Sequence, residues 1–300
     1  STNTDGLSTY SGDNTLTTAS PITVTITSPS SGATISRPDI MVKGTITNTT
    51  GNETGVTVNG VVATVYGDAF VANHVPLTEG ANTITVKATD TAGYTATASI
   101  TVTANTTGNY IQLTTSIESG ISPLETTLRV EGYASSTTPT ISYTGPGSVD
   151  WTNCTSYDAC KVKMTTEGVY TFTATGTGTD GNTYQDAVAI TVLSRTEIDA
   201  LLQAKWSGMK TKLAAQDVEG AVSYFVSTSQ ERYRDIFTAL STRLPELVQN
   251  MQDIQLVYLK NNAAKYRIRK NELYGGQNLT ITYYIYFEVD ISGVWRIGLF

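Results

Sequence analysis

Alternation of apolar and polar side chains is the feature that most restricts the fold of this 300-residue chain. Runs such as ITVTITSP, NTITVKATD and VYTFTATG place an apolar residue at every second position, the period of a strand with one buried face. Gly, Pro, Asn and Asp separate these runs about every 8–12 positions, a spacing typical of β-sandwiches. Asn59-Gly60 is the strongest turn signal, because both residues accept the positive φ angles of a tight hairpin. Residues 21–193 are therefore predicted to be all-β.

The pattern changes at Ser194. Ser194 and Glu197 form the S-x-x-E sequence that caps the start of a helix, and apolar residues with helical spacing follow. Asp217, and Thr228 with Glu231, are predicted to cap two further helices. The chain then ends in four strand-like runs: IQLVYLK, AKYRIRK, LTITYYIYFEV and VWRIGLF. Helices followed by an antiparallel meander indicate an α+β domain.

The predicted fold class is therefore multidomain, with two all-β sandwiches followed by an α+β domain. We expect a polar N-terminal tail or donor-type strand at 1–20, because these residues are rich in Thr and Ser and bury too little to order alone. The remaining divisions are a sandwich at 21–104, a linker at 105–109, a second sandwich at 110–193 and the α+β domain at 194–300.

Three resemblances refine this division. The segments VTVNG, DAFVANHVPLTEGANTITVKATDTAG and SITV resemble bacterial immunoglobulin-like domains of secreted and surface proteins. That resemblance implies an immunoglobulin-like spacer or adhesive module, with Asp90 holding a turn. The segments SGISPLETTLRVEGYAS and TTEGVYTFTATG resemble PKD-like domains, although the W-D-F-G-D-G signature of that family is missing.

The third resemblance concerns residues 194–300. The junction AAQDVEGAVSYF, the order of helices and strands, and the closing GVWRIGLF are similar to the nuclear transport factor two-like family. This resemblance implies a cone, in which a curved antiparallel sheet wraps around helices. Members of that family that are enzymes place Asp, His or Tyr inside the cone, and members often pair through the outer face of the sheet.

Composition restricts the environment and the partners. Residues 1–193 hold 6 Lys or Arg and 15 Asp or Glu, whereas residues 194–300 hold 13 and 11. This balance argues against nucleic acid, which requires a concentrated basic face. No apolar run reaches the roughly 18 residues of a membrane span. The low charge content, 15%, is typical of an extracellular β protein.

Cysteine usage favours the same compartment. Cys154 and Cys160 are the only cysteines, and we expect them to form a disulfide, with free thiols in a reducing compartment as the alternative. Because the chain begins at Ser1, we expect that a signal peptide has been removed and that the protein is secreted or on the cell surface.

The candidate interface lies in the last strands. In LTITYYIYFEV, the residues Leu279 to Phe287 at odd positions form an apolar face that should pack on the helices. The opposite face combines Tyr with Lys and Arg, which are residue types suited to interfaces. Its candidate interface residues are Arg267, Arg269, Tyr284 and Tyr286. A merely solvated face is the alternative.

The sequence gives little support for a catalytic site or for a bound cofactor. The chain has one histidine, His74, which we expect to be an ordinary strand residue, and no G-x-S-x-G motif accompanies it. Asp180, Asn182 and Asp186 could offer oxygens to Ca²⁺, but Asp-Gly-Asn is also a common turn. We therefore expect no catalytic residue, no metal and no cofactor.

These observations predict a non-enzymatic extracellular or cell-surface structural protein. Two rod-like sandwiches would present a C-terminal interaction domain, as in a fibre subunit or an adhesin-like stalk, with protein partners or self-association. In the fibre version, residues 1–20 add a strand to a neighbouring copy. The alternative is a ligand- or glycan-binding module that uses the cone or the sandwich loops.

Overall fold

The computed structural model describes residues 20–132, 138–152, 154 and 159–300. Within these residues the chain forms three hydrophobic cores, one in each of three units. We name them the N-terminal sandwich (20–104), the middle sandwich (110–193) and the C-terminal unit (194–300). Apart from residue 20, the predicted tail or donor strand at 1–20 lies outside the described residues.

The N-terminal sandwich is one eight-stranded sheet that folds over on itself, in the order β1-β3-β6-β5-β4-β7-β8-β2. Alternation explains the strands: Ile84, Val86 and Ala88 point inward from β7, while Lys87 between them is exposed. The hairpin turn predicted at Asn59-Gly60 is confirmed, with φ angles of 47° and 85°. The strands are β1 (Ile22–Ser28), β2 (Thr34–Ile35), β3 (Asp39–Asn48), β4 (Thr54–Val58), β5 (Val61–Tyr66), β6 (Ala69–Pro76), β7 (Gly80–Asp90) and β8 (Thr95–Ala104).

The middle sandwich packs a four-stranded sheet, β13-β14-β11-β9, against the sheet that contains β12-β15-β16-β10. Tyr170, Phe172 and Ala174 alternate inward from β15 and fill its centre. The predicted disulfide joins Cys154 to buried Cys160, with their Cα atoms 4.2 Å apart. The strands are β9 (Ile111–Thr115), β10 (Ser119–Ile121), β11 (Leu124–Gly132), β12 (Thr140–Thr144), β13 (Val149–Thr152), β14 (Cys160–Met164), β15 (Gly168–Thr177) and β16 (Thr183–Leu193).

The C-terminal unit packs helices on an antiparallel sheet, as the sequence predicted. Ser194 caps the first helix by accepting a hydrogen bond from the Glu197 amide, and Asp217 caps the second by accepting from Gly220. The capping box predicted at Thr228 is wrong: the third helix begins at Ser227 and has no side-chain cap, since Val226 occupies the cap position. The helices are α1 (Arg195–Ala214), α2 (Val218–Val222), α3 (Ser227–Ala239), the 3₁₀ turn η1 (Ser241–Arg243) and α4 (Leu244–Gln249).

Four strands complete this unit: β17 (Gln255–Lys260), β18 (Ala263–Tyr274), β19 (Gln277–Val289) and β20 (Trp295–Leu299). They do not form a sheet of their own. The short strand β10 pairs with β16 on one side and, at Gly120, with Lys260 of β17 on the other. One eight-stranded sheet, in the order β12-β15-β16-β10-β17-β18-β19-β20, therefore runs from the middle sandwich into the C-terminal unit.

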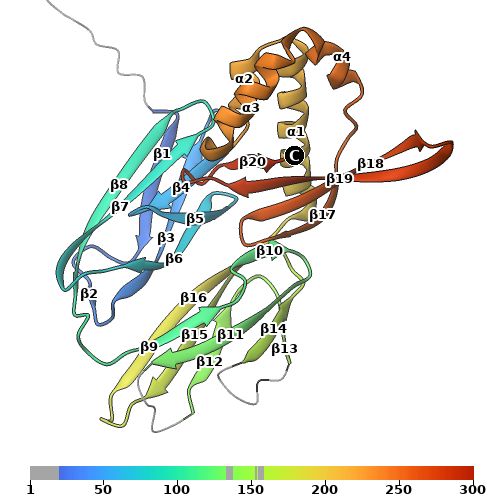
Figure 1. Cartoon of the computed structure of the whole chain (residues 1–300). Coiled ribbons are helices and arrows are strands. Elements are labelled where there is room, and N and C mark those ends of the chain that lie inside the picture. Colours follow the sequence, from blue (N-terminus) through green and yellow to red (C-terminus); the bar gives the residue numbers. More distant parts are fainter. Residues whose placement is uncertain (1–19, 133–137, 153, 155–158) are drawn as a thin grey trace, which may run out of the picture.

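The three units form a triangle, because the N-terminal sandwich contacts both of the others (Figure 1). Asn73 exchanges two hydrogen bonds with the backbone of Ala189 in the middle sandwich, at 2.8 and 2.9 Å. Glu53 reaches the C-terminal unit, where it accepts a hydrogen bond from the Trp295 amide at 2.8 Å. This arrangement corrects the expectation of two rod-like sandwiches that hold the C-terminal unit at the end of a stalk.

Among the described helices, none combines the length and the apolar character that spanning a bilayer requires.

Candidate interaction surface

The residues predicted to form an interface lie together on one face of β18 and β19. The strand register places Lys265 opposite Tyr286, Arg267 opposite Tyr284 and Arg269 opposite Thr282. The Lys265 Nζ atom lies 3.7 Å from the centre of the Tyr284 ring and 5.3 Å from that of Tyr286. We call Lys265, Arg267, Arg269, Tyr284 and Tyr286 the basic–tyrosine face.

This face is cationic and partly exposed: Arg269 and Tyr284 are exposed, and the other three residues are half-buried. A hydrogen bond with Tyr286 raises the pKa of Lys265, so the ammonium group remains charged at neutral pH. A cation held over aromatic rings contributes about 0.5–1 kcal/mol at an exposed site. The Arg267 Nε atom donates to Gln255 of β17 at 3.4 Å, which extends the polar surface across a third strand.

The opposite face of the same strands packs on the helices. Tyr266, Ile285 and Phe287 are buried there, and the Tyr266 hydroxyl donates to Asp199 of α1 at 2.8 Å. Burial and this carboxylate raise the pKa of Tyr266, which keeps the hydroxyl protonated. The prediction of an apolar face on β19 is therefore correct only for the part that includes Ile285 and Phe287. Toward the tip of the hairpin, Leu279 and Tyr283 are exposed.

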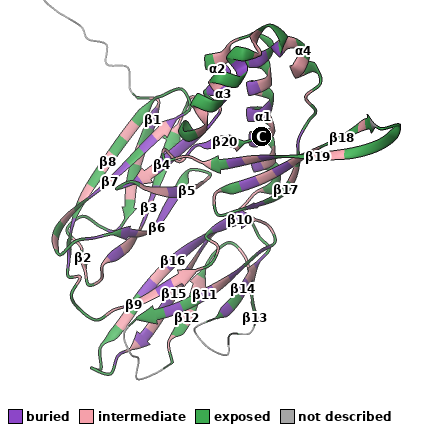
Figure 2. Ribbon diagram, in the orientation of Figure 1, coloured by how far each residue is buried: buried purple, intermediate pink, exposed green. Residues whose placement is uncertain are grey.

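The reason is that β18 and β19 extend far beyond the helices (Figure 1). β17 pairs with β18 only as far as Arg267, and β20 pairs with β19 only from Tyr286 onward. Among the described residues, 268–274 and 277–283 therefore pair only with each other, and we call them the projecting hairpin. Its outer part is largely exposed, and Leu273 near the tip is 72% accessible (Figure 2).

An apolar groove of about 220 Å³ lies at the root of the projecting hairpin. Trp206, Met251 and Phe300 line it together with residues of both hairpin strands: Tyr283, Tyr284 and Ile285 of β19, and Ile268, Lys270 and Glu272 of β18. Phe300 follows directly after β20, so the groove opens where β20 ends and the free part of β19 begins.

The interior of the predicted cone is packed with aromatic side chains. Phe225 stacks on Tyr233, with ring centres 4.2 Å apart, and Tyr233 stacks on Phe300 at 5.2 Å. The Tyr233 hydroxyl also donates to the Phe300 carbonyl oxygen at 2.8 Å. Tyr233 therefore serves as a core residue whose hydroxyl is satisfied within the fold.

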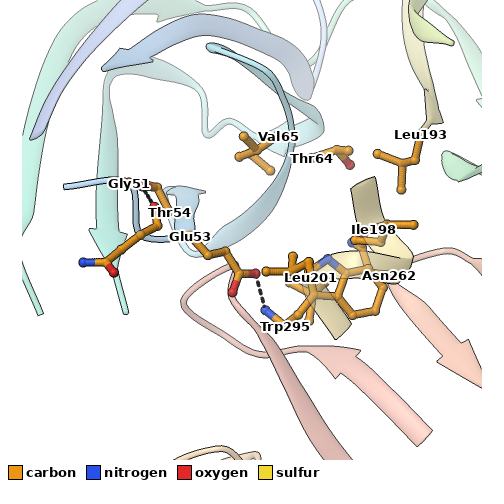
Figure 3. Close-up of a pocket in the computed structure, with 14 residues that line it drawn as sticks. Gly51, Glu53, Thr54, Thr64, Val65, Leu193, Ile198, Leu201, Asn262 and Trp295 are labelled. Atoms are coloured by element: carbon orange, nitrogen blue, oxygen red, sulfur yellow. Dashed lines mark hydrogen bonds between the residues drawn. The ribbon is translucent and has the colours of Figure 1, made fainter. Parts of the chain in front are cut away.

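A larger cavity, about 350 Å³, lies where the three units meet (Figure 3). Apolar side chains from the middle sandwich and α1 (Leu193, Ile198 and Leu201) line it together with Glu53. The Glu53 carboxylate is already engaged, since Oε1 accepts from the Trp295 amide and Oε2 lies 2.5 Å from the Lys205 ammonium nitrogen. The carboxylate therefore ties the N-terminal sandwich to the C-terminal unit.

The possible calcium ligands do not come together. Asp180 accepts hydrogen bonds from the Tyr184 hydroxyl at 2.5 Å and from the Asn182 amide at 3.0 Å, as in an ordinary turn. Asp186 instead points toward the N-terminal sandwich, where it pairs with Arg37 and accepts a hydrogen bond from the Leu113 amide. The described residues contain no group of three or more His, Cys, Asp or Glu side chains arranged to hold a metal ion.

A polar cluster that was not predicted from the sequence joins the N-terminal sandwich to the middle sandwich. Asp39 of β3 accepts hydrogen bonds from Arg37 at 2.6 Å and from Gln112 of the middle sandwich at 2.9 Å. His74, expected to be an ordinary strand residue, has a φ of 50° and places Nδ1 3.2 Å from Asp39. Burial acts to raise the pKa of Asp39, but the His74 hydrogen bond and the Arg37 charge outweigh it and hold that pKa below its ordinary value.

Comparison with known families gives one match, to the family described as "Glucodextranase, domain B", over residues 22–106. The match covers the N-terminal sandwich and less than half of the chain. The comparison with curated proteins gave no match.

Solved structures with β-sandwich modules are also similar. Fibronectin(III)-like modules of Clostridium thermocellum CbhA share 13% identity, cover 58% of this chain and 95% of their own, and have a TM-score of 0.22. A chimeric titin Z1Z2 shares 16% identity over 59% of this chain and 100% of its own, with a TM-score of 0.23. Protocadherin gamma B7 cadherin domains 1–4 share 12% identity over 58% of this chain and only 50% of their own, with a TM-score of 0.21. At these TM-scores the likenesses carry no argument, and the fold rests on the strands and helices described above.

Proposed function

We propose that this chain is a non-enzymatic structural protein of the extracellular space or the cell surface, and that its C-terminal unit mediates self-association. The observation that carries the proposal is the projecting hairpin together with the basic–tyrosine face at its root. A two-stranded ribbon is marginally stable by itself in water, and Tyr and Arg are enriched at the centres of protein interfaces. A partner that covers the hairpin would stabilise it.

Within this proposal the three units are a bacterial immunoglobulin-like sandwich (21–104), a PKD-like sandwich (110–193) and a nuclear transport factor two-like unit (194–300). The motifs quoted from the sequence support these assignments. The disulfide between Cys154 and Cys160 and the low content of charged residues support an oxidising, extracellular location.

Light scattering coupled to size exclusion tests the proposal on the whole chain, over a concentration series. We expect the mass to rise above that of a monomer as the concentration increases. The double variant Arg267→Ala/Tyr284→Ala should weaken association at least tenfold, because it removes two side chains that lie opposite each other on the basic–tyrosine face.

The matched control is Lys87→Ala/Tyr94→Ala, which removes an exposed cation and an exposed tyrosine from the N-terminal sandwich. Its association should equal that of the unaltered chain. A chain that stays monomeric at every concentration would refute the proposal, and so would equal association of both double variants.

A finer form of the proposal is a fibre, which requires a second contact in addition to the first. Residues 1–20 are the proposed second contact, as a strand added to a neighbouring copy. Deleting residues 1–20 should then leave the first contact intact and abolish any larger polymer. Polymers of unchanged length after the deletion would exclude this role for the tail.

A further inference from the structure

The outer edge of β19 is free and uncharged over the projecting hairpin. From Gln277 to Ile285 no strand among the described residues pairs with this edge, since β20 pairs with β19 only from Tyr286 onward. The sequence of the free part is QNLTITYYI, which contains no charge and no proline and is rich in β-branched and aromatic residues. Such an edge favours the addition of another strand.

The other edge of the same hairpin has the opposite character. The free part of β18 carries Arg269, Lys270 and Glu272, and charged side chains on an edge oppose pairing with another strand. The β18 edge of the projecting hairpin is therefore protected against strand addition, and the β19 edge is not. An added strand would lie beside β19, in line with β20.

The surroundings of that position also suit an added strand. The apolar groove lined by Trp206, Met251 and Phe300 opens where β20 ends, and it is lined both by Tyr283 and Ile285 of β19 and by Ile268, Lys270 and Glu272 of β18. A strand beside β19 would place every second side chain on the face that carries Tyr283, next to this groove. An apolar side chain at that point would be removed from water.

We infer that the added strand is the same segment of a second copy, paired antiparallel about a two-fold axis at Ile281. This inference rests on the proposed function and names the contact through which self-association occurs. About this axis Thr280 lies opposite Thr282, Leu279 opposite Tyr283 and Asn278 opposite Tyr284. Cross-strand pairs of β-branched and aromatic residues stabilise a sheet, and isologous two-fold contacts are the commonest in oligomers.

Charge favours this antiparallel arrangement over a parallel one. In the two-fold ribbon the basic–tyrosine faces of the two copies lie at opposite ends, separated by the uncharged segment, so their cations do not meet. A parallel addition would bring Lys265, Arg267 and Arg269 of both copies to the same end of the ribbon, where like charges repel. Leu279 of one copy also comes beside Tyr283 of the other, at the mouth of the groove.

The variant Ile281→Lys tests the contact, because it places two lysines opposite each other at the two-fold axis. Light scattering of the whole chain should show a dissociation constant for the dimer raised at least tenfold. The control is Leu273→Lys, which adds the same charge near the exposed tip but outside the pairing edge. Its dissociation constant should be unchanged.

Cross-linking gives a second readout that does not depend on weakening the contact. Residues opposite each other in antiparallel strands have Cβ atoms about 4.5–5.5 Å apart, so Ile281→Cys should give a covalent dimer on mild oxidation. Leu273→Cys should not, because the two tips lie at opposite ends of the ribbon. The native cysteines already form a disulfide and do not compete.

The outcomes separate this inference from the proposed function. If Arg267→Ala/Tyr284→Ala weakens association but Ile281→Lys does not, self-association stands and the β19 edge is not its contact. Equal cross-linking through positions 281 and 273 would also overturn the two-fold arrangement. A monomeric chain at every concentration would overturn both proposals.

Discussion

The backbones of Gly55 in β4 and Gly293 in the turn between β19 and β20 touch each other across the boundary between two units. A Cβ atom on Gly293 would lie 3.0 Å from the Gly55 Cα atom and 2.6 Å from the Val56 nitrogen. Side chains at these positions would force the N-terminal sandwich away from the C-terminal unit. Glycine thus permits the close approach that lets Glu53 reach Lys205 and Trp295.

The variant Gly293→Ala should destabilise the chain through this contact. Its left-handed φ of 86° costs alanine about 1–2 kcal/mol, and the clash adds about 1–3 kcal/mol. Urea unfolding measures the sum. The matched control is Gly93→Ala, in a turn with the same D-x-x-G form, a φ of 90° and open space around the Cβ position. Equal losses in the two variants would show that the contact contributes nothing.

The variant Lys205→Met should cost about 3 kcal/mol of unfolding free energy, because it leaves the Glu53 carboxylate buried without its counter-charge. Adding Glu53→Gln removes that charge and keeps an oxygen for the Trp295 amide, so the double variant should recover part of the loss. A thermodynamic cycle from chemical denaturation measures the coupling. Additive losses would mean that the two side chains do not interact.

The single histidine should titrate above its ordinary pKa of about 6.5. The hydrogen bond to Asp39 raises the pKa of His74, burial opposes it, and the negative charges of Asp39, Asp186 and Glu118 add to the rise. Because the folded pKa is the higher one, protonated His74 stabilises the fold fully below about pH 6.5, and this contribution is lost as the pH rises through the folded value.

Nuclear magnetic resonance can follow this titration directly, since a single histidine gives a single set of imidazole signals. Unfolding of the parent chain and of His74→Gln on both sides of that pH range gives the stability effect. The parent should lose stability relative to the variant as the pH rises. A titration midpoint at or below the ordinary value would contradict the contact with Asp39.

Removing the disulfide by Cys154→Ser/Cys160→Ser should lower the unfolding free energy by about 2 kcal/mol, because the bond closes only a short loop. Reductant should lower the unfolding free energy of the parent chain by the same amount and leave that of the double variant unchanged. Two titratable thiols in the untreated folded protein would contradict the disulfide.

Features that depend on neighbouring residues were predictable from the sequence. The alternation in β7 and β15 predicted which side chains face the core, and Asn59-Gly60 predicted a hairpin. Ser194 and Asp217 marked true helix starts, because a cap uses an amide only three residues away. Arg267 and Tyr284 lie on the same face of the sheet, as the alternation in both strands predicted, whereas their direct pairing is known only from the structure.

Features that join distant parts of the chain were not predictable. Arg37 pairs with Asp186 and Glu53 pairs with Lys205, and no local pattern connects residues so far apart. The predicted apolar face of β19 is wrong from Tyr283 toward the hairpin tip, because the periodicity marks one face of a strand but not where the helices that cover it end. His74 looked ordinary because its partner Asp39 lies on another strand.

The continuous sheet through β10 also sets the order in which this protein can be completed during its synthesis. β10 is made early, yet its partner at Lys260 leaves the ribosome about 140 residues later. Until then Ser119 and Gly120 present an open edge in a nascent chain whose two sandwiches have otherwise been translated. A stall or truncation before β17 would therefore leave an open strand edge on the otherwise complete middle sandwich, and aggregation of such fragments is the expected result.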